Sequence, residues 1–202
     1  KHGLHIRRKM IQVQNIFQIP VYSVFINTIN LEELKNYCFK QQKQDSGRII
    51  SNRGGYQSND VNLKNKVLKP LIKEIEQHSL NFARPIVNEE PQKISNLWIN
   101  INSQNNTNIA HNHPDADISG VFYINTPKDC GNIVFKHPAF DLLSYYNTNQ
   151  KISNWTTYNS SEWELEANEG IMYLFPSWLN HYVLPNNNKK EERISMSFNT
   201  KC

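Results

Sequence analysis

Hydrophobic and polar residues follow one pattern before about residue 93 and another after it. In the first part, apolar residues recur at intervals of three and four across residues 63–75, which predicts an amphipathic helix. A second helix is predicted from residue 31, because Asn30 is a good N-cap and acidic residues follow it. Residues 15–26 are rich in β-branched and aromatic side chains and predict a strand. The first part is therefore expected to be mostly helical.

After residue 93, short apolar runs alternate with Asn, Gly, Pro and Asp. Such spacing is typical of short antiparallel strands in a sandwich or barrel. We predict a mainly β fold, a double-stranded β-helix or cupin-like jelly roll over residues 94–202, buttressed by N-terminal helices within residues 10–93. The runs are ISNLWININ, TNIAHNH, ISGVFYIN, GNIVFKH, EWELEA, GIMYLFP, LNHYVLP and RISMSFN.

Chain length favours one domain. The 202 residues suffice to bury a substantial core, and we treat residues 10–202 as a single unit. The basic residues 1–9 precede Met10, a natural start, so we expect a leader or a cloning remnant outside the fold. No apolar run approaches the roughly 18 residues of a membrane span, and signal-peptide features are missing from the opening residues. We expect a cytoplasmic protein without membrane contact.

Cysteine usage and charge argue against three other classes of protein. Cys38, Cys130 and Cys202 are widely spaced and form no paired motif, which predicts free thiols in a reducing compartment rather than disulfides or a thiolate zinc site. The net charge is +4, but the lysines are scattered and often lie beside acidic residues, as in KKEER. This indicates a solvated surface rather than a nucleic-acid interface.

The stretch IAHNHPDADISGVFYIN carries three candidate metal ligands, His111, His113 and Asp115, at alternate positions before an apolar run. Alternate residues share one face of a strand, so the two histidines would point the same way. Asp115 would join them only if the strand continued past Pro114, and a proline favours a strand end. Taken alone, the histidine pair also fits an ordinary surface feature.

His181 lies far downstream in a second strand-like run, GIMYLFPSWLNHYVLP. Two ligands near one strand end and one from a distant strand form the arrangement that places three ligands on one face of a metal, with open positions for a cosubstrate. Arg193 and Ser195 follow, two apart on one strand face. A guanidinium with a hydroxyl beside it forms a clamp for a carboxylate.

These residues resemble the iron(II)- and 2-oxoglutarate-dependent oxygenases, and more narrowly an uncharacterised branch known from marine bacteria and cyanophages. The motifs that carry the resemblance run in order from about residue 50 to the end of the sequence. They are GGYQSND at 54–60, WIN at 98–100, HNHPDADISGVFY at 111–123, FPSWLNH at 175–181 and RISMSFN at 193–199.

The resemblance implies that Fe(II) is bound near His181 and the 111–115 cluster, with 2-oxoglutarate chelating the metal through its 2-oxo acid end. The distal carboxylate of 2-oxoglutarate would meet Arg193 and Ser195. Tyr123 is similar in placement to a tyrosine that assists this contact in prolyl-hydroxylase-like members.

Two ligand sets compete at the metal. We favour His111, His113 and His181, because the narrower branch repeats His-x-His. The alternative is His113, Asp115 and His181, because the wider superfamily uses His-x-Asp plus a distant His. An all-histidine set would carry one negative charge fewer.

The predicted function is that of a hydroxylase, which couples decarboxylation of 2-oxoglutarate to oxidation of a C–H bond. The substrate is expected to be a small molecule or a peptidyl side chain. A homodimer is a candidate assembly. A cupin-type dioxygenase that does not use 2-oxoglutarate would keep the histidines without needing Arg193. A non-catalytic jelly-roll binding protein would need neither. The four tryptophans, Trp98, Trp155, Trp163 and Trp178, are expected to be core or loop-anchoring aromatics.

Overall fold

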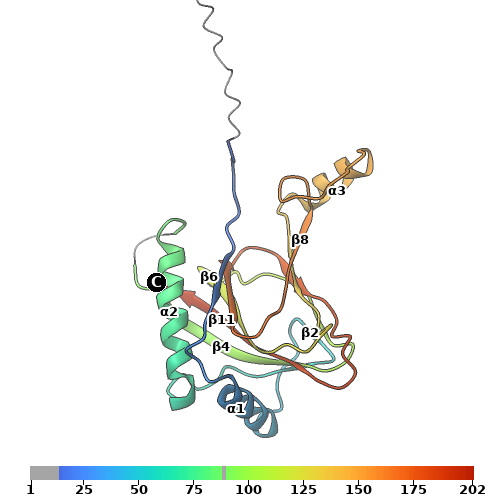
Figure 1. Cartoon of the computed structure of the whole chain (residues 1–202). Coiled ribbons are helices and arrows are strands. Elements are labelled where there is room, and N and C mark those ends of the chain that lie inside the picture. Colours follow the sequence, from blue (N-terminus) through green and yellow to red (C-terminus); the bar gives the residue numbers. More distant parts are fainter. Residues whose placement is uncertain (1–13, 88–89) are drawn as a thin grey trace, which may run out of the picture.

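The computed structural model describes residues 14–87 and 90–202, so the expected leader at residues 1–9 lies outside the described residues. Two antiparallel sheets face each other and form the body of the molecule (Figure 1). The six-stranded sheet has the order β1 (Tyr22–Phe25), β9 (Ile171–Pro176), β6 (Ile118–Asn125), β11 (Arg193–Lys201), β4 (Lys93–Asn102) and β3 (Tyr56–Gln57). The five-stranded sheet has the order β2 (Asn52–Arg53), β5 (Thr107–His111), β10 (His181–Val183), β7 (Ile133–Lys136) and β8 (Glu162–Leu165).

All of the apolar runs predicted after residue 93 form strands, and the predicted mainly β architecture is confirmed. The strand expected at residues 15–26 is shorter, because it begins only after Pro20, which has no backbone N–H to donate. The motif GGYQSND contains the connection between two strands and the whole of the second strand. Its glycine pair joins β2 to β3, and these two short strands enter different sheets.

Two helices cover the outer face of the six-stranded sheet (Figure 1). The first, α1 (Leu31–Gln44), begins where predicted, and the side chain of Asn30 accepts a hydrogen bond from the Glu33 N–H at 3.1 Å. The second, α2 (Lys69–Ala83), follows the 3₁₀ turn η1 (Lys66–Leu68) and has Pro70 in its first turn, where a missing N–H costs nothing. The buried cluster that the helices share with this sheet includes Leu34, Cys38, Leu71, Ile75, Ile194, Met196 and Phe198.

A third helix, α3 (Phe140–Thr148), was not predicted. It lies in the long connection between β7 and β8, contains no buried residue, and projects beyond the barrel (Figure 1). Trp98 is buried, as expected of a core aromatic. The other three are exposed, namely Trp155, Trp163 and Trp178.

Cys38 and Cys130 are buried free thiols, as predicted. Within residues 14–87 and 90–202, none of the helices combines the length and the hydropathy that crossing a bilayer requires.

Candidate functional site

The structure brings three histidines together at one end of the barrel. His111 is the last residue of β5 and His181 is the first of β10, and these two residues are paired across the antiparallel ladder. His113 follows two residues later, and its backbone N–H donates to the Ser177 carbonyl at 2.9 Å. One nitrogen from each of the three rings lies within 4.8 Å of the others. Such a spacing allows one ion to touch all three.

Asp115 does not join this group. It lies in the turn that follows Pro114, and its side chain is exposed. In the part of the chain that the structure describes, the histidines form the one cluster with metal-ligand spacing, and no carboxylate belongs to it. β5 already ends at His111, so the strand does not continue to Pro114, and Asp115 lies in the turn rather than beside the histidines.

Two of the three rings are oriented by backbone carbonyls. Nδ1 of His111 lies 2.7 Å from the Ile109 oxygen, and Nδ1 of His181 lies 2.9 Å from the Leu179 oxygen. A carbonyl can only accept, so each Nδ1 carries the proton and each Nε2 keeps a free lone pair for a metal. The ring of His113 is held differently, because it packs against Trp98 with the ring centroids 5.6 Å apart.

Burial keeps the three imidazoles uncharged. Loss of hydration lowers the pKa of His113 to about 4, and the nearby His111 adds to this shift. The pKa of His181 falls well below its usual value for the same two reasons, and burial also lowers the pKa of His111. Neutral imidazole is the form that binds metals. The cluster is therefore ready to bind a metal at neutral pH without first losing protons.

The histidines line a cavity between the two sheets that also contains Arg193. This arginine begins β11 and is 2% exposed. Its Nη1 donates to three backbone carbonyls, those of Cys130 at 2.8 Å, Gly131 at 2.9 Å and Leu184 at 3.3 Å. Within the described residues no carboxylate forms an ion pair with it, and neither Nη2 nor Nε has a hydrogen-bond acceptor. A buried guanidinium of this kind calls for an anionic ligand.

Hydroxyl-bearing side chains line the same cavity as this guanidinium. Ser195 and Ser197 face the same cavity as Arg193, whereas Ile194, Met196 and Phe198 face the core, so the predicted alternation along this strand is confirmed. Tyr123 lies opposite Ser195 on β6 and is 2% exposed. Burial raises the pKa of Tyr123, although Arg193 opposes that shift. The phenol therefore stays protonated and can donate a hydrogen bond.

Three further polar residues line the cavity and were not predicted as site residues from the sequence. Asn100 donates from Nδ2 to the Ser197 hydroxyl at 3.0 Å. Asn108 donates to the Ser51 hydroxyl at 3.2 Å, and both of these line the cavity as well. Asn108 and His111 are three residues apart, and the pairing of β5 with β10 shifts register between them. Because of this bulge both face the cavity, which strict alternation cannot predict.

A model of the family described as "Putative 2OG-Fe(II) oxygenase" matches residues 96–199. Comparison with curated proteins found no matching sequence. A Pseudomonas putida prolyl-4-hydroxylase superposes with a TM-score of 0.62 at 14% identity, over 91% of this chain and 94% of that one. Streptomyces hygroscopicus HygX with nickel and 2-oxoglutarate bound gives a TM-score of 0.60 at 9% identity, over 90% and 82% of the chains.

A prolyl hydroxylase from Trichoplax adhaerens, in complex with a peptide fragment of the hypoxia inducible factor oxygen degradation domain, gives a TM-score of 0.58 at 11% identity. That likeness covers 89% of this chain and 82% of the hydroxylase. Such identities bear on the fold alone. The three superpositions and the two antiparallel sheets confirm the predicted double-stranded β-helix.

Proposed function

Because the chain belongs to the family of 2OG-Fe(II) oxygenases, we propose that His111, His113 and His181 hold its iron(II), and that Arg193 holds its 2-oxoglutarate. The protein is an oxygenase that uses iron(II) and 2-oxoglutarate. One observation carries the residue assignment. A single cavity contains three clustered neutral histidines and a buried arginine for which the described residues provide no acidic partner.

The donor set of the cluster fits iron(II). Imidazole nitrogen is a suitable ligand for this ion, and three protein ligands leave further coordination positions for a cosubstrate and oxygen. The three ligands are neutral, so the protein supplies no negative charge at the metal. The 2-oxo acid carboxylate of 2-oxoglutarate would offset one of the two positive charges, because the distal carboxylate would pair with Arg193. Asp115 remains the alternative ligand, and its exposed position in the turn argues against it.

The surroundings of Arg193 fit the distal carboxylate of 2-oxoglutarate. Nη1 is held by carbonyls, which fixes the plane of the guanidinium and leaves Nη2 and Nε for the ligand. An arginine fork matches a carboxylate in shape and charge. The hydroxyls of Ser195 and Tyr123 are additional donors, and both side chains line the same cavity.

Iron(II) with 2-oxoglutarate supplies the oxidation, in which O₂ and 2-oxoglutarate give succinate and CO₂ while one oxygen atom enters a substrate C–H bond as a hydroxyl. The side chains of this protein orient the reactants and exclude water. Val121, Ile133 and Phe175 form apolar walls of the cavity. His181 is deeply buried, whereas His111 and His113 are partly exposed.

We further propose a single domain over residues 10–202 in the reducing cytoplasm. The participation of β1, β2 and β3 in the two sheets supports the single domain, and the free thiols of Cys38 and Cys130 support the reducing compartment. The substrate is a small molecule or a peptidyl side chain, and the Trichoplax hydroxylase with its bound peptide is one precedent for the latter. A homodimer remains our candidate assembly, and nucleic acid is not expected as a partner.

Calorimetric titration of 2-oxoglutarate tests the assignment directly, with zinc(II) in place of iron to prevent turnover. Arg193→Lys retains the charge but loses the fork, and binding should weaken by about 1.5 to 3 kcal/mol, roughly 10- to 100-fold. Arg53→Lys, at an exposed arginine, is the matched control and should leave the affinity unchanged.

Two results would contradict the proposal. Unchanged 2-oxoglutarate affinity in both Arg193→Lys and Arg193→Ala would show that Arg193 does not hold this cosubstrate. Purified wild-type protein that binds neither iron(II) nor zinc(II) would favour a non-catalytic jelly roll.

A further inference from the structure

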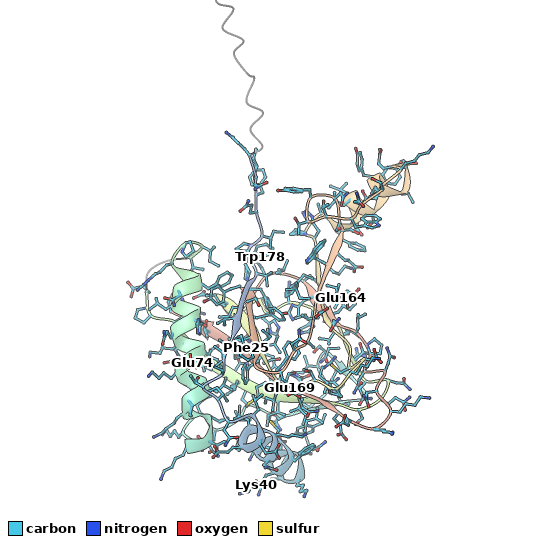
Figure 2. The ribbon with its side chains drawn as sticks, in the orientation of Figure 1. Phe25, Lys40, Glu74, Glu164, Glu169 and Trp178 are labelled. Carbon is cyan, nitrogen blue, oxygen red and sulfur yellow. The ribbon has the colours of Figure 1, made fainter. Side chains whose placement is uncertain are left out.

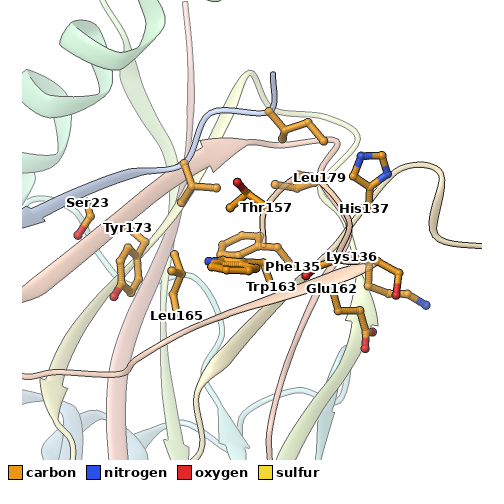
Figure 3. A pocket seen from close by; sticks show the side chains of 14 residues that line it. Ser23, Phe135, Lys136, His137, Thr157, Glu162, Trp163, Leu165, Tyr173 and Leu179 are labelled. Atoms are coloured by element: carbon orange, nitrogen blue, oxygen red, sulfur yellow. The ribbon is translucent and has the colours of Figure 1, made fainter. Parts of the chain in front are cut away.

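A second cavity, of about 390 Å³, lies beside the metal centre (Figure 3). Its floor is formed by Phe135 of β7 and Trp163 of β8, which are direct partners across the two strands. Leu165 and Tyr173 form one wall (Figure 3). This volume and this apolar lining are typical of a site for a small organic group or one large side chain.

The second cavity is one layer of side chains away from the histidines. The ring of Phe135 in its floor lies 6.1 Å from the ring of His181, centroid to centroid. Leu179 also lines the cavity, and its carbonyl is the one that orients His181. A molecule seated there would therefore be next to the proposed reaction centre.

A group of exposed aromatic side chains lies next to the opening of this cavity. The connection of residues 137–161 leaves β7 at the end of the barrel where Phe135 pairs with His181, and it projects away from the barrel (Figure 1). Trp178 lies at the same end (Figure 2). The exposed large side chains of the connection are Leu142 at 75%, Tyr145 at 76%, Tyr146 at 60%, Trp155 at 60% and Tyr158 at 73%. Exposed patches rich in Tyr and Trp mark interaction sites.

The charge of this connection argues against a polyanionic partner. Between residues 138 and 161 the charged side chains are Asp141 and Lys151, and they cancel. The remaining polar residues are Asn, Gln, Ser, Thr and Tyr, a composition like that of antibody loops that bind polypeptides. A nucleic-acid site would instead require a cluster of Lys and Arg.

The edge of a sheet next to the cavity fits the main chain of a polypeptide. β8 is the last strand of its sheet and pairs with β7 on one side. On its other side, none of the strands in the described residues covers it. The outward N–H and C=O groups of such an edge are matched by an added peptide strand, and neither an oligosaccharide nor a small metabolite offers that repeat.

We propose that this oxygenase acts on a polypeptide, which lies along β8 and the 137–161 connection with one apolar side chain in the second cavity. The residue to be oxidised then reaches the histidine cluster one side-chain layer away. The inference rests on the proposed function for the reaction, whereas the docking itself needs no metal.

The experiment selects peptides from a display library of random twelve-residue sequences on the immobilised zinc(II) form with 2-oxoglutarate. Enriched peptides are synthesised with a fluorescent label, and their affinity is measured by anisotropy. Trp163→Ala and Tyr158→Ala should each weaken binding about 10-fold or more. Ile49→Ala, at an exposed apolar residue outside the docking surface, should not. Bound peptide should also slow hydrogen exchange of the backbone amides in residues 162–165.

Failure of docking and failure of the proposed function give different results. His181→Ala should bind the selected peptides as wild type does and release no succinate. Peptide binding without succinate release by the wild-type iron(II) form would overturn the proposed reaction and leave the docking surface standing. The docking inference is overturned if no peptide is enriched, or if Tyr158→Ala, an exposed loop variant that should fold normally, binds as tightly as wild type. It is also overturned if single-stranded DNA or a cello-oligosaccharide binds in a Trp163-dependent manner in place of peptides.

Discussion

Each histidine of the cluster is fixed by a different part of the chain. His111 is oriented by the Ile109 carbonyl of its own strand, and His181 by the Leu179 carbonyl in the turn that precedes β10. His113 depends on a main-chain bond to Ser177 and on the Trp98 ring. The ligand geometry is thus built from local contacts as well as from the pairing of β5 with β10.

Substitutions can separate the two ligand sets. His181→Ala should abolish stoichiometric iron(II) binding while the fold persists, because both sets include this residue. His111→Ala should also lose the metal, whereas Asp115→Ala should bind it almost as wild type does, since Asp115 is exposed in a turn. Metal analysis and circular dichroism of the purified variants give the answer. The opposite result for His111 and Asp115 would establish the His-x-Asp set.

Stability of the metal-stripped protein should depend on pH through the histidines. The folded-state pKa of His113 is about 4 against an ordinary 6.5, so the unfolded chain takes up a proton first as the pH falls. Stability is therefore present above about pH 6.5 and is lost as the pH falls from there toward 4, by about 2 kcal/mol at pH 5 from this residue alone.

Urea unfolding of the stripped protein at pH 7, 6 and 5 measures this loss. His113→Asn removes the titrating group and should flatten the slope. A slope that is identical in wild type and His113→Asn would show that His113 does not carry the effect.

At the scale of single residues, the sequence predicted which side chains face the cavity wherever inward and outward positions alternate regularly along a strand. Arg193 and Ser195 could be placed on one face because β11 is regular there. Asn108 could not, because the bulge between β5 and β10 changes which residues face inward. The proline after His113 was informative because it restricts the backbone directly.

Among the elements, β6 depends on a residue without a side chain. A Cβ added to Gly120 would lie 2.3 Å from Cζ of Phe198 and 2.7 Å from the Tyr173 carbonyl oxygen. The glycine therefore lets the aromatic ring of β11 lie across β6, where the two residues are cross-strand partners.

Gly120→Ala should lower the free energy of unfolding by about 1 to 3 kcal/mol through overpacking. Denaturant titration measures it, with Phe198→Leu and the double variant completing a cycle. The smaller leucine should relieve part of the clash, so the double variant should be more stable than the sum of the single effects predicts. Strict additivity would show that the ring and the new methyl group do not collide.

The strands were predictable because turn residues separate short apolar runs along the chain. The helix α3 was not, because it has no side-chain N-cap and buries none of its apolar residues, so it has no inward-facing stripe that a periodicity search would detect.

On the scale of the whole molecule, ligand binding should raise thermal stability in two separable steps. Zinc(II) at about 100 times its Kd contributes roughly 2.7 kcal/mol, and 2-oxoglutarate at a similar excess adds a comparable amount. For a domain of this size, each step corresponds to about 5 to 11 °C in Tm. Arg193→Lys should keep the first step and lose most of the second, and His181→Ala should lose both.

Thermal unfolding followed by intrinsic fluorescence, with each ligand alone and then with both, provides the measurement. A 2-oxoglutarate step of full size in Arg193→Lys would place the cosubstrate elsewhere in the molecule.

The three carbonyls around Arg193 have a consequence for how such a protein diverges over time. Any residue supplies a carbonyl, so Cys130 and Leu184 can be replaced without removing the groups that hold the guanidinium. Gly131 is different, because its φ is +84° and a Cβ there would meet the Leu184 oxygen at 2.2 Å. Two loops can therefore drift almost freely in sequence while the arginine keeps its place, provided that one glycine stays.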